Sequence, residues 1–144
     1  MTILGMNFTK IDVEKKGAMK GKVSINNNVT IKEVSVIDIS MGSAKQKVLK
    51  FDFEFSSKYE PSFGHINLLG DLVFMAGDEK KTKELADAWK KDKKMPPEVM
   101  TPVMNSILSK SNMEAIVLSR EINLPPPLPM PKISGQNKDQ QYIG

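Results

Sequence analysis

The sequence predicts an α+β fold in which an antiparallel β-sheet comes first and two helices, packed on one face of the sheet, come second. Alternating apolar and polar residues, the pattern of half-buried strands, are confined to residues 7–75. Helical periodicity begins only at residue 79, and no internal repeat interrupts this order. Runs of strands followed by runs of helices are typical of the α+β class, whereas parallel sheets alternate strands with helices.

Two of the strand segments lie before residue 40. Asn7–Glu14 alternates loosely, as expected of a strand with one solvated face. Residues 23–39 predict a longer strand whose apolar phase shifts at Lys32 and Glu33. Because one extra residue in a strand restores such a phase, we expect a β-bulge at this point.

The other two strand segments carry the predicted core. Residues 49–55 place Phe51, Phe53 and Phe55 on one face and charged residues on the other, the clearest period of two in the chain. Gly64–Met75 has apolar residues on both faces. A strand of this kind is buried on both of its faces, so we expect a helix on one face and another sheet or subunit on the other. This pattern predicts a homo-oligomer.

The first helix is predicted to begin at Glu79, with Asp78 as its N-cap and with Trp89 on its apolar face. It ends in a basic cluster, which Met95-Pro96-Pro97 terminates. Cations complement the negative end of a helix dipole, so a solvated helix end is one interpretation. A contact with nucleic acid or with an acidic protein is the other. The cluster consists of Lys90, Lys91, Lys93 and Lys94.

The second helix is predicted to begin with Thr101 as N-cap and Pro102 as the first helical residue, with one turn before it at Glu98–Met100. Pro125 disfavours the α conformation of Leu124 and so ends the helix nearby. The predicted apolar stripe passes through Met104, Ile107, Leu108, Ala115, Leu118 and Ile122.

Five prolines among residues 125–131 predict an extended arm, because proline holds φ near its polyproline II value and donates no hydrogen bond. The arm, residues 124–133, is interpreted as a segment that packs on its own sheet or on that of a neighbouring subunit. A ligand for a WW or SH3 groove is an alternative. The methionines of this third of the chain either line a surface for varied apolar partners or fill the core.

The composition predicts one domain, residues 1–133, and a disordered polar tail, residues 134–144. No segment has the pattern of a signal peptide or the roughly 20 apolar residues of a membrane span, so we expect a cytoplasmic protein. The formal net charge is +4, but Arg120 is the only arginine. Base recognition favours arginine, so only nonspecific nucleic-acid contact is expected.

The sequence offers little for catalysis. His65 is the only histidine and no cysteine is present, so no cluster of such side chains can bind a metal or act as a nucleophile. The carboxylate pairs Asp12/Glu14 and Asp52/Glu54 have the spacing of solvent-facing strand positions. Neither glycine motif for phosphate binding occurs. We therefore expect a protein that is not an enzyme and that uses no cofactor.

The segment Met95–Ile133 resembles a family of small archaeal proteins that is related in fold to the protein-export chaperone SecB. The resemblance covers residues 6–133, and its specific part consists of Pro97-Glu98-Val99, Pro102-Val103, Asn105, Ile107-Leu108, Glu114-Ala115-Ile116, Arg120-Glu121 and the proline run from Leu124 to Ile133.

This resemblance implies a SecB-like fold, with a four-stranded antiparallel sheet and two helices on one face, assembled into dimers or tetramers. It also implies ATP-independent binding of nonnative polypeptides in apolar grooves. SecB is acidic and works with an export motor, whereas this chain is basic, so general holding of nonnative chains is implied rather than export. The candidate client contacts are Phe51, Phe53, Phe55, Trp89, Leu124, Pro126, Pro127, Leu128, Pro129 and Met130.

An alternative function is that of a non-catalytic accessory protein of a ribosome or another RNA–protein assembly. Its contacts would be the basic cluster Lys90–Lys94 and the proline arm. The salt dependence of binding distinguishes the two functions, because phosphate contacts weaken steeply as the salt concentration rises and apolar contacts do not.

Overall fold

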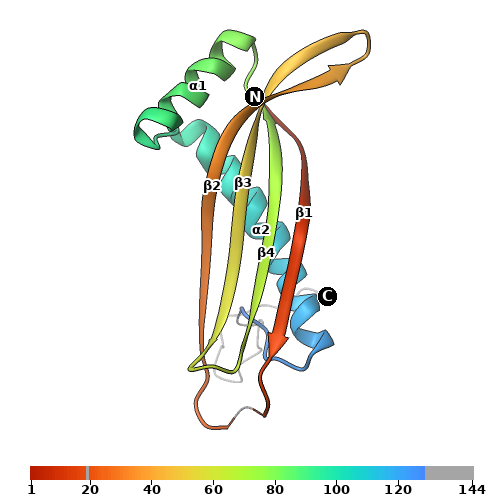
Figure 1. Cartoon of the computed structure of the whole chain (residues 1–144), viewed down its shortest axis with the longest axis vertical. Helices are drawn as coiled ribbons and strands as arrows, with labels where there is room; N and C mark the ends of the chain where they lie inside the picture. The colour runs from red at the N-terminus through yellow and green to blue at the C-terminus, as the bar shows by residue number, and fades with distance from the viewer. Residues whose placement is uncertain (19, 129–144) are drawn as a thin grey trace, which may run out of the picture.

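The computed structural model describes residues 1–18 and 20–128 of the chain (Figure 1). Four strands precede two helices and form one antiparallel sheet in the order β1-β4-β3-β2. This confirms the α+β prediction. The elements are β1 Thr2–Lys15, β2 Ser24–Met41, β3 Ala44–Glu60, β4 Gly64–Met75, α1 Glu79–Asp92 and α2 Pro97–Glu121.

The strands are longer than the sequence pattern predicts. β1 begins at Thr2 rather than Asn7, and β3 extends beyond the predicted segment 49–55 at both ends. The added ends of β3 are mainly polar and pair through their backbone with β2, which apolar periodicity does not register. The register between β2 and β3 shifts between Ile31 and Glu33, which confirms the predicted bulge.

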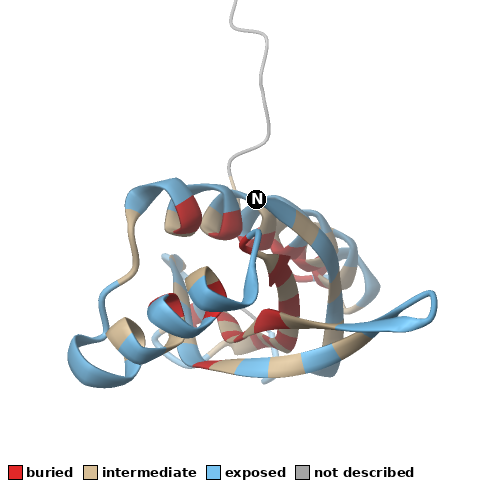
Figure 2. Cartoon of the chain, turned by 90° about the horizontal axis from the view of Figure 1, so that it is seen from above, coloured by how far each residue is buried: buried red, intermediate tan, exposed pale blue. Residues whose placement is uncertain are grey.

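Burial alternates along the central strands, as Figure 2 shows by colour. Phe51, Phe53 and Phe55 lie on the face toward the helices and are at most 1% exposed. Asp52 and Glu54 lie between them on the opposite face and are half-buried. The same inner layer is completed on β4 by Ile66, Leu68, Leu72 and Phe74.

The opposite face of β4 carries Leu69, Val73 and Met75, which are only half-buried. Both helices pack on the inner face of the sheet. The sequence pattern predicts that this outer face of β4 is also covered, but none of the described elements of this chain packs on it.

α1 begins as predicted, because the Asp78 carboxylate accepts a hydrogen bond of 2.7 Å from the backbone N–H of Lys81. Thr82 and Leu85 are buried, and Trp89 packs against the core. Lys93 has the left-handed φ of 56° and donates its N–H to the Trp89 carbonyl, which ends the helix.

α2 begins earlier than predicted. It starts at Pro97, so Thr101 is not its N-cap and Pro102 lies inside the helix. Pro97 is favourable as the first helical residue, because the N–H group that proline lacks would have no partner at that position. Pro102 and Glu98 are both exposed, so water can bond to the Glu98 carbonyl that Pro102 leaves unpaired. The helix is consequently one continuous element of 25 residues.

The buried stripe of α2 also differs from the predicted one, since only Ile107 and Ala115 are common to both. A spacing of four residues drifts around a helix of about 3.6 residues per turn, so the line of contact rotates as α2 crosses the twisted sheet. Its second half presents small side chains, which allow a close approach to the strands. The buried residues are Val99, Val103, Ile107, Ser111, Ala115 and Ser119.

The helices cover the sheet unequally. α2 packs mainly on β4 and β3 and only lightly on β1, whereas α1 covers β2 and β3. Consequently α2 leaves part of the inner face of each edge strand uncovered, and a groove runs along each of its flanks.

Candidate functional site

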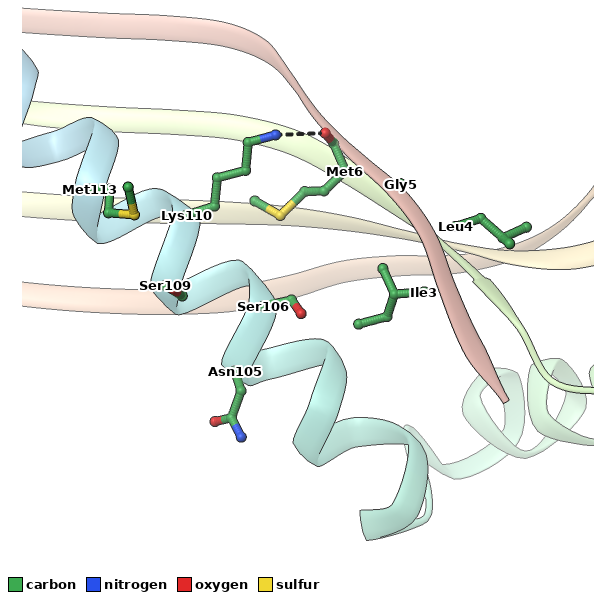
Figure 3. A pocket seen from close by; sticks show the side chains of 9 residues that line it. All are labelled: Ile3, Leu4, Gly5, Met6, Asn105, Ser106, Ser109, Lys110 and Met113. Carbon is green, nitrogen blue, oxygen red and sulfur yellow. Dashed lines mark hydrogen bonds between the residues drawn. The ribbon is translucent and has the colours of Figure 1, made fainter.

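The larger groove, of about 490 Å³, lies between β1 and α2 and is called here the α2–β1 groove. Ile3 and Met6 point from β1 toward the helix, and Met113 flanks the groove from α2 (Figure 3). Met113 is 67% exposed, an unusual position for a large apolar side chain. The remaining lining residues are Leu4, Gly5, Asn105, Ser106, Ser109 and Lys110.

Lys110 connects the two walls of the α2–β1 groove. Its Nζ donates a hydrogen bond of 3.0 Å to the Met6 carbonyl and lies 5.8 Å from the centroid of the Phe8 ring. β1 is an edge strand, so one row of its backbone N–H and C=O groups has no strand partner within the described chain. An extended chain that paired with this edge would place its side chains against the groove.

A second groove, of about 310 Å³, lies on the other flank of α2 and is called the α2–β2 groove. Val29 lines it from β2 and Met104 and Leu108 line it from α2, with the fully buried Phe55 beneath them. Leu128 of the proline arm also lines it. Three asparagines complete the lining, namely Asn27, Asn28 and Asn112.

The proline arm packs on its own sheet over the described residues 124–128. Leu124 is buried, and its N–H donates to the Ser119 carbonyl at the end of α2. The Tyr59 hydroxyl donates a hydrogen bond of 2.6 Å to the Pro125 carbonyl. Burial raises the pKa of Tyr59 to about 12, so the phenol is a neutral donor at physiological pH.

An asparagine on β2 holds the next part of the arm. The Ser57 hydroxyl donates to the Asn27 side-chain carbonyl, and this orients the amide so that its Nδ2 donates to the Pro127 carbonyl over 2.9 Å. Residues 124–128 of the arm therefore dock on their own subunit, which is one of the two arrangements expected from the sequence.

The structure divides the predicted contact residues into three groups. Phe51, Phe53 and Phe55 lie in the core beneath the helices and have no accessible surface for a partner. Among the arm residues, Leu124 and Pro127 are buried, Leu128 is half-buried and Pro126 is exposed. Pro129 and Met130 lie outside the described residues, as do the predicted domain end at residue 133 and the predicted tail 134–144.

Trp89 and the basic cluster lie together at the end of α1. The Lys93 Nζ lies 5.6 Å from the centroid of the Trp89 ring, and Trp89 is half-buried. Lys90, Lys91 and Lys94 are exposed. Trp89, Lys90 and Lys93 also line a third groove of about 380 Å³ between α1 and β2, with Glu33 and Asp87 as acidic neighbours. The acidic side chains offset part of the positive charge at this site.

The similarities to known proteins concern the fold. No family model and no curated protein matches the sequence. A solved structure that is similar is the SecB-like chaperone Rv1957 of Mycobacterium tuberculosis in complex with a ChAD peptide from the Rv1956 HigA1 antitoxin. The similarity covers 92% of this chain and 90% of that chain, at 12% sequence identity and a TM-score of 0.51.

This chain has a SecB-like fold. The fold expected from the resemblance is thereby confirmed, including the four-stranded sheet and the two helices on one face. None of the helices in the described part of the chain is both long and apolar enough to cross a membrane.

Within this SecB-like fold, sequence reasoning missed the α2–β1 groove. The sequence pattern predicts the first strand only from Asn7, so it does not indicate Ile3, Leu4 and Met6 as lining residues. The apolar pair Ile3-Leu4 before Gly5 was the available signal. The sequence shows Met113 only as a member of the methionine cluster, because periodicity does not indicate which methionines stay exposed.

The ionisable side chains of the SecB-like sheet form pairs on its outer face rather than a catalytic cluster. The His65 Nε2 lies 3.2 Å from the Asp12 carboxylate, and both groups are accessible to solvent. Lys50 pairs with Asp52, and Lys32 pairs with Glu54. Among the described residues, no group of three His, Asp or Glu side chains is placed to hold a metal ion.

Proposed function

We propose that this protein is a cytoplasmic, ATP-independent, non-enzymatic chaperone or peptide-binding module that holds nonnative polypeptides. The proposal includes membership in the archaeal family that Met95–Ile133 resembles. It uses the apolar grooves beside α2 rather than the three core phenylalanines as the binding surface.

The α2–β1 groove carries this proposal. It combines the exposed Met113 and the half-buried Ile3 and Met6 with the free edge of β1. Nonnative chains expose apolar side chains and unpaired backbone groups together, so a groove beside an open strand edge satisfies both. Methionine side chains adapt to varied partners, which suits binding without sequence selectivity.

The similar chaperone of known structure supports a peptide as the ligand class. That protein was solved with a peptide of an antitoxin bound. At 12% identity the likeness concerns the fold, so the peptide-binding role of this chain rests on the grooves described above.

The test is suppression of the aggregation of an unfolding model protein, without ATP, at low and at high salt. Protection that persists at high salt supports binding through apolar contacts. A folded, soluble sample that gives no protection at any molar ratio rejects the proposal.

We also propose that the protein is a homo-oligomer, a dimer or tetramer, assembled through the outer face of β4. Leu69, Val73 and Met75 are the side chains to be covered, because no element among the described residues packs over them. Light scattering measures the assembly mass, and Val73→Lys is expected to reduce it. A monomeric mass for the unmodified protein rejects this part of the proposal.

A second candidate function is an accessory role in a ribosome or another RNA–protein assembly. The observation that favours it is the exposure of Lys90, Lys91 and Lys94 at one end of α1. Binding of this type must weaken steeply between low and high salt. Salt-independent protection of a model protein would therefore reject it as the explanation of that activity.

A further inference from the structure

Lys110 is the one ionisable side chain among the residues that line the α2–β1 groove. The other lining residues are apolar side chains, a glycine, two serines and an asparagine. None of the ion pairs among the described residues includes Lys110, not even with Glu114, which lies one turn further along α2. The described part of the chain therefore places a positive charge in this groove and pairs no carboxylate with it.

A hydrogen bond places this charge beside β1. Lys110 reaches from α2 across the groove, where its Nζ donates to the Met6 carbonyl over 3.0 Å (Figure 3). The same Nζ lies 5.8 Å from the centroid of the Phe8 ring. An ammonium group has three N–H donors, and Met6 accepts one of them. Because Lys110 is exposed, a carboxylate can reach the other donors from solvent without breaking the bond to Met6.

β1 offers a short stretch of regular strand edge at this point. Its register with β4 shifts between Ile3 and Gly5 and again between Phe8 and Lys10. β-Bulges of this kind interrupt the pairing of an edge strand. The regular edge of β1 beside the groove therefore consists of residues 5–8, a length of about 13 Å for four residues of a strand.

An extended segment that pairs with residues 5–8 brings one side chain next to Lys110. Residues opposite each other on neighbouring antiparallel strands have Cβ atoms about 4.5–5.5 Å apart. Met6 points toward α2, so the residue opposite it directs its side chain into the groove as well. Every second side chain of a strand points to the same face. The side chains two positions before and after therefore lie toward Ile3 and Phe8, which pack against the core.

We propose that Lys110 makes the α2–β1 groove selective for extended segments of the pattern apolar-x-acidic-x-apolar. The carboxylate of the central residue binds the Lys110 Nζ, and the two apolar side chains pack against Ile3 and Phe8. This selectivity rests on the peptide-binding function proposed above. Charge complementarity favours such a segment over β1 of a second copy, because residues 2–8 of this chain contain no carboxylate.

A lysine beside a strand edge has a competing explanation, because such residues also keep other chains from pairing with the edge. The two explanations predict opposite effects of removing the charge. Without a protective lysine, every extended segment would bind more tightly. Without a selective lysine, only segments with a carboxylate on the apolar face bind differently, and they bind more weakly.

The test measures the affinity of short fluorescent peptides for the full-length chain at low salt. The acidic peptide is Leu-Ser-Leu-Ser-Glu-Ser-Leu-Ser-Leu, with both ends blocked so that its side chain is the only carboxylate. The neutral peptide has Gln in place of Glu. In the third peptide the Glu exchanges places with the Ser before it, so that it points to the opposite face. We expect the acidic peptide to bind about fivefold more tightly than the other two, as the strongest accessible ion pairs allow.

Lys110→Gln is expected to abolish this difference, and Lys110→Glu to bind the acidic peptide more weakly than the neutral one. Lys91→Gln is the matched control, because it removes the same charge from an exposed lysine on α1 and should leave the difference unchanged. Circular dichroism verifies that each variant folds. A further measurement needs no variant: at high salt the unmodified chain should lose the preference for the acidic peptide and still bind the neutral one.

Equal affinities for the acidic and neutral peptides would overturn the selectivity, as would a preference that persists in Lys110→Gln. Tighter binding of all three peptides to Lys110→Gln would overturn it in favour of the protective lysine. A fall in assembly mass when peptide is added, measured by light scattering, would identify a second copy as the occupant and overturn the assignment. Binding of the neutral peptide supports the proposed peptide-binding function even where selectivity fails, whereas no binding of any peptide would overturn both.

Discussion

The Tyr59 hydroxyl and the Pro125 carbonyl are joined by a hydrogen bond of 2.6 Å between β3 and the chain segment that leaves α2. Tyr59 is 1% exposed, so its hydroxyl has no alternative partner in bulk water. The bond fixes the point at which the proline arm meets the sheet.

Tyr59→Phe is expected to lower the free energy of unfolding by about 1–2 kcal/mol. The substitution keeps the ring in place but leaves the Pro125 carbonyl without its donor. Chemical denaturation followed by circular dichroism measures the change. An unchanged free energy of unfolding would mean that the bond contributes nothing to stability.

The stability of the protein is expected to fall as the pH rises from about 10 to about 12. Burial raises the pKa of Tyr59 to about 12 in the folded state, whereas an unfolded tyrosine has a pKa of about 10. The full stabilisation is present below pH 10. Within the window the unfolded state loses the phenolic proton first, so this group alone lowers stability by about 1.4 kcal/mol per pH unit.

Lysines titrate in the same range, so the measurement compares the unmodified chain with Tyr59→Phe. Denaturation is followed at several pH values between 9 and 12, as the window of about 10 to 12 requires. The unmodified chain should lose stability more steeply than the variant. Parallel curves would show that Tyr59 does not titrate as described.

Gly70→Ala is expected to lower the free energy of unfolding by about 1–3 kcal/mol, the usual range for overpacking. A Cβ at Gly70 would lie 2.6 Å from Cζ of Phe53 and would collide with the Asn7 carbonyl. Gly5→Ala is the matched control, because a Cβ at Gly5 meets no atom within 4 Å. If both variants unfold at the same denaturant concentration, β1 does not approach β4 as closely as described.

Ala115→Leu is expected to destabilise the protein by about 1–3 kcal/mol, because the larger side chain pushes α2 away from the sheet. Ala115 is fully buried, whereas Val117 on the same helix is 49% exposed. Val117→Leu should therefore change stability by less than about 0.5 kcal/mol. Thermal unfolding distinguishes the two variants, and a tolerated Ala115→Leu would contradict the buried stripe of α2.

Apolar periodicity was sufficient to predict the fold class, the order of elements, the bulge after Ile31 and the N-cap Asp78. These features are local, because each depends on side chains within a few positions. The predicted start of α2 was wrong for a physical reason. Thr101-Pro102 has the chemistry of a helix start, but Pro97, five residues before Pro102, is itself a favourable first helical residue and begins the helix.

The candidate site was less accessible to sequence reasoning. Phe51, Phe53 and Phe55 were predicted correctly as one face of a strand, but periodicity does not tell a core face from the floor of a groove. That distinction depends on where α2 lies across the sheet, which is a tertiary property. The arm was predicted to dock, and its partners Tyr59 and Asn27 could not be chosen without the structure.

The central claim is that nonnative polypeptides bind in the α2–β1 groove. The most direct measurement is the affinity of a fluorescent, permanently unfolded polypeptide for the unmodified chain, Met113→Ser and Val117→Ser. Met113 lines the groove, whereas the nearby exposed Val117 does not. We expect Met113→Ser to weaken binding about tenfold, as loss of a central apolar contact does, and Val117→Ser to change it little. Equal affinities for all three proteins, or no binding to any of them, would contradict the claim.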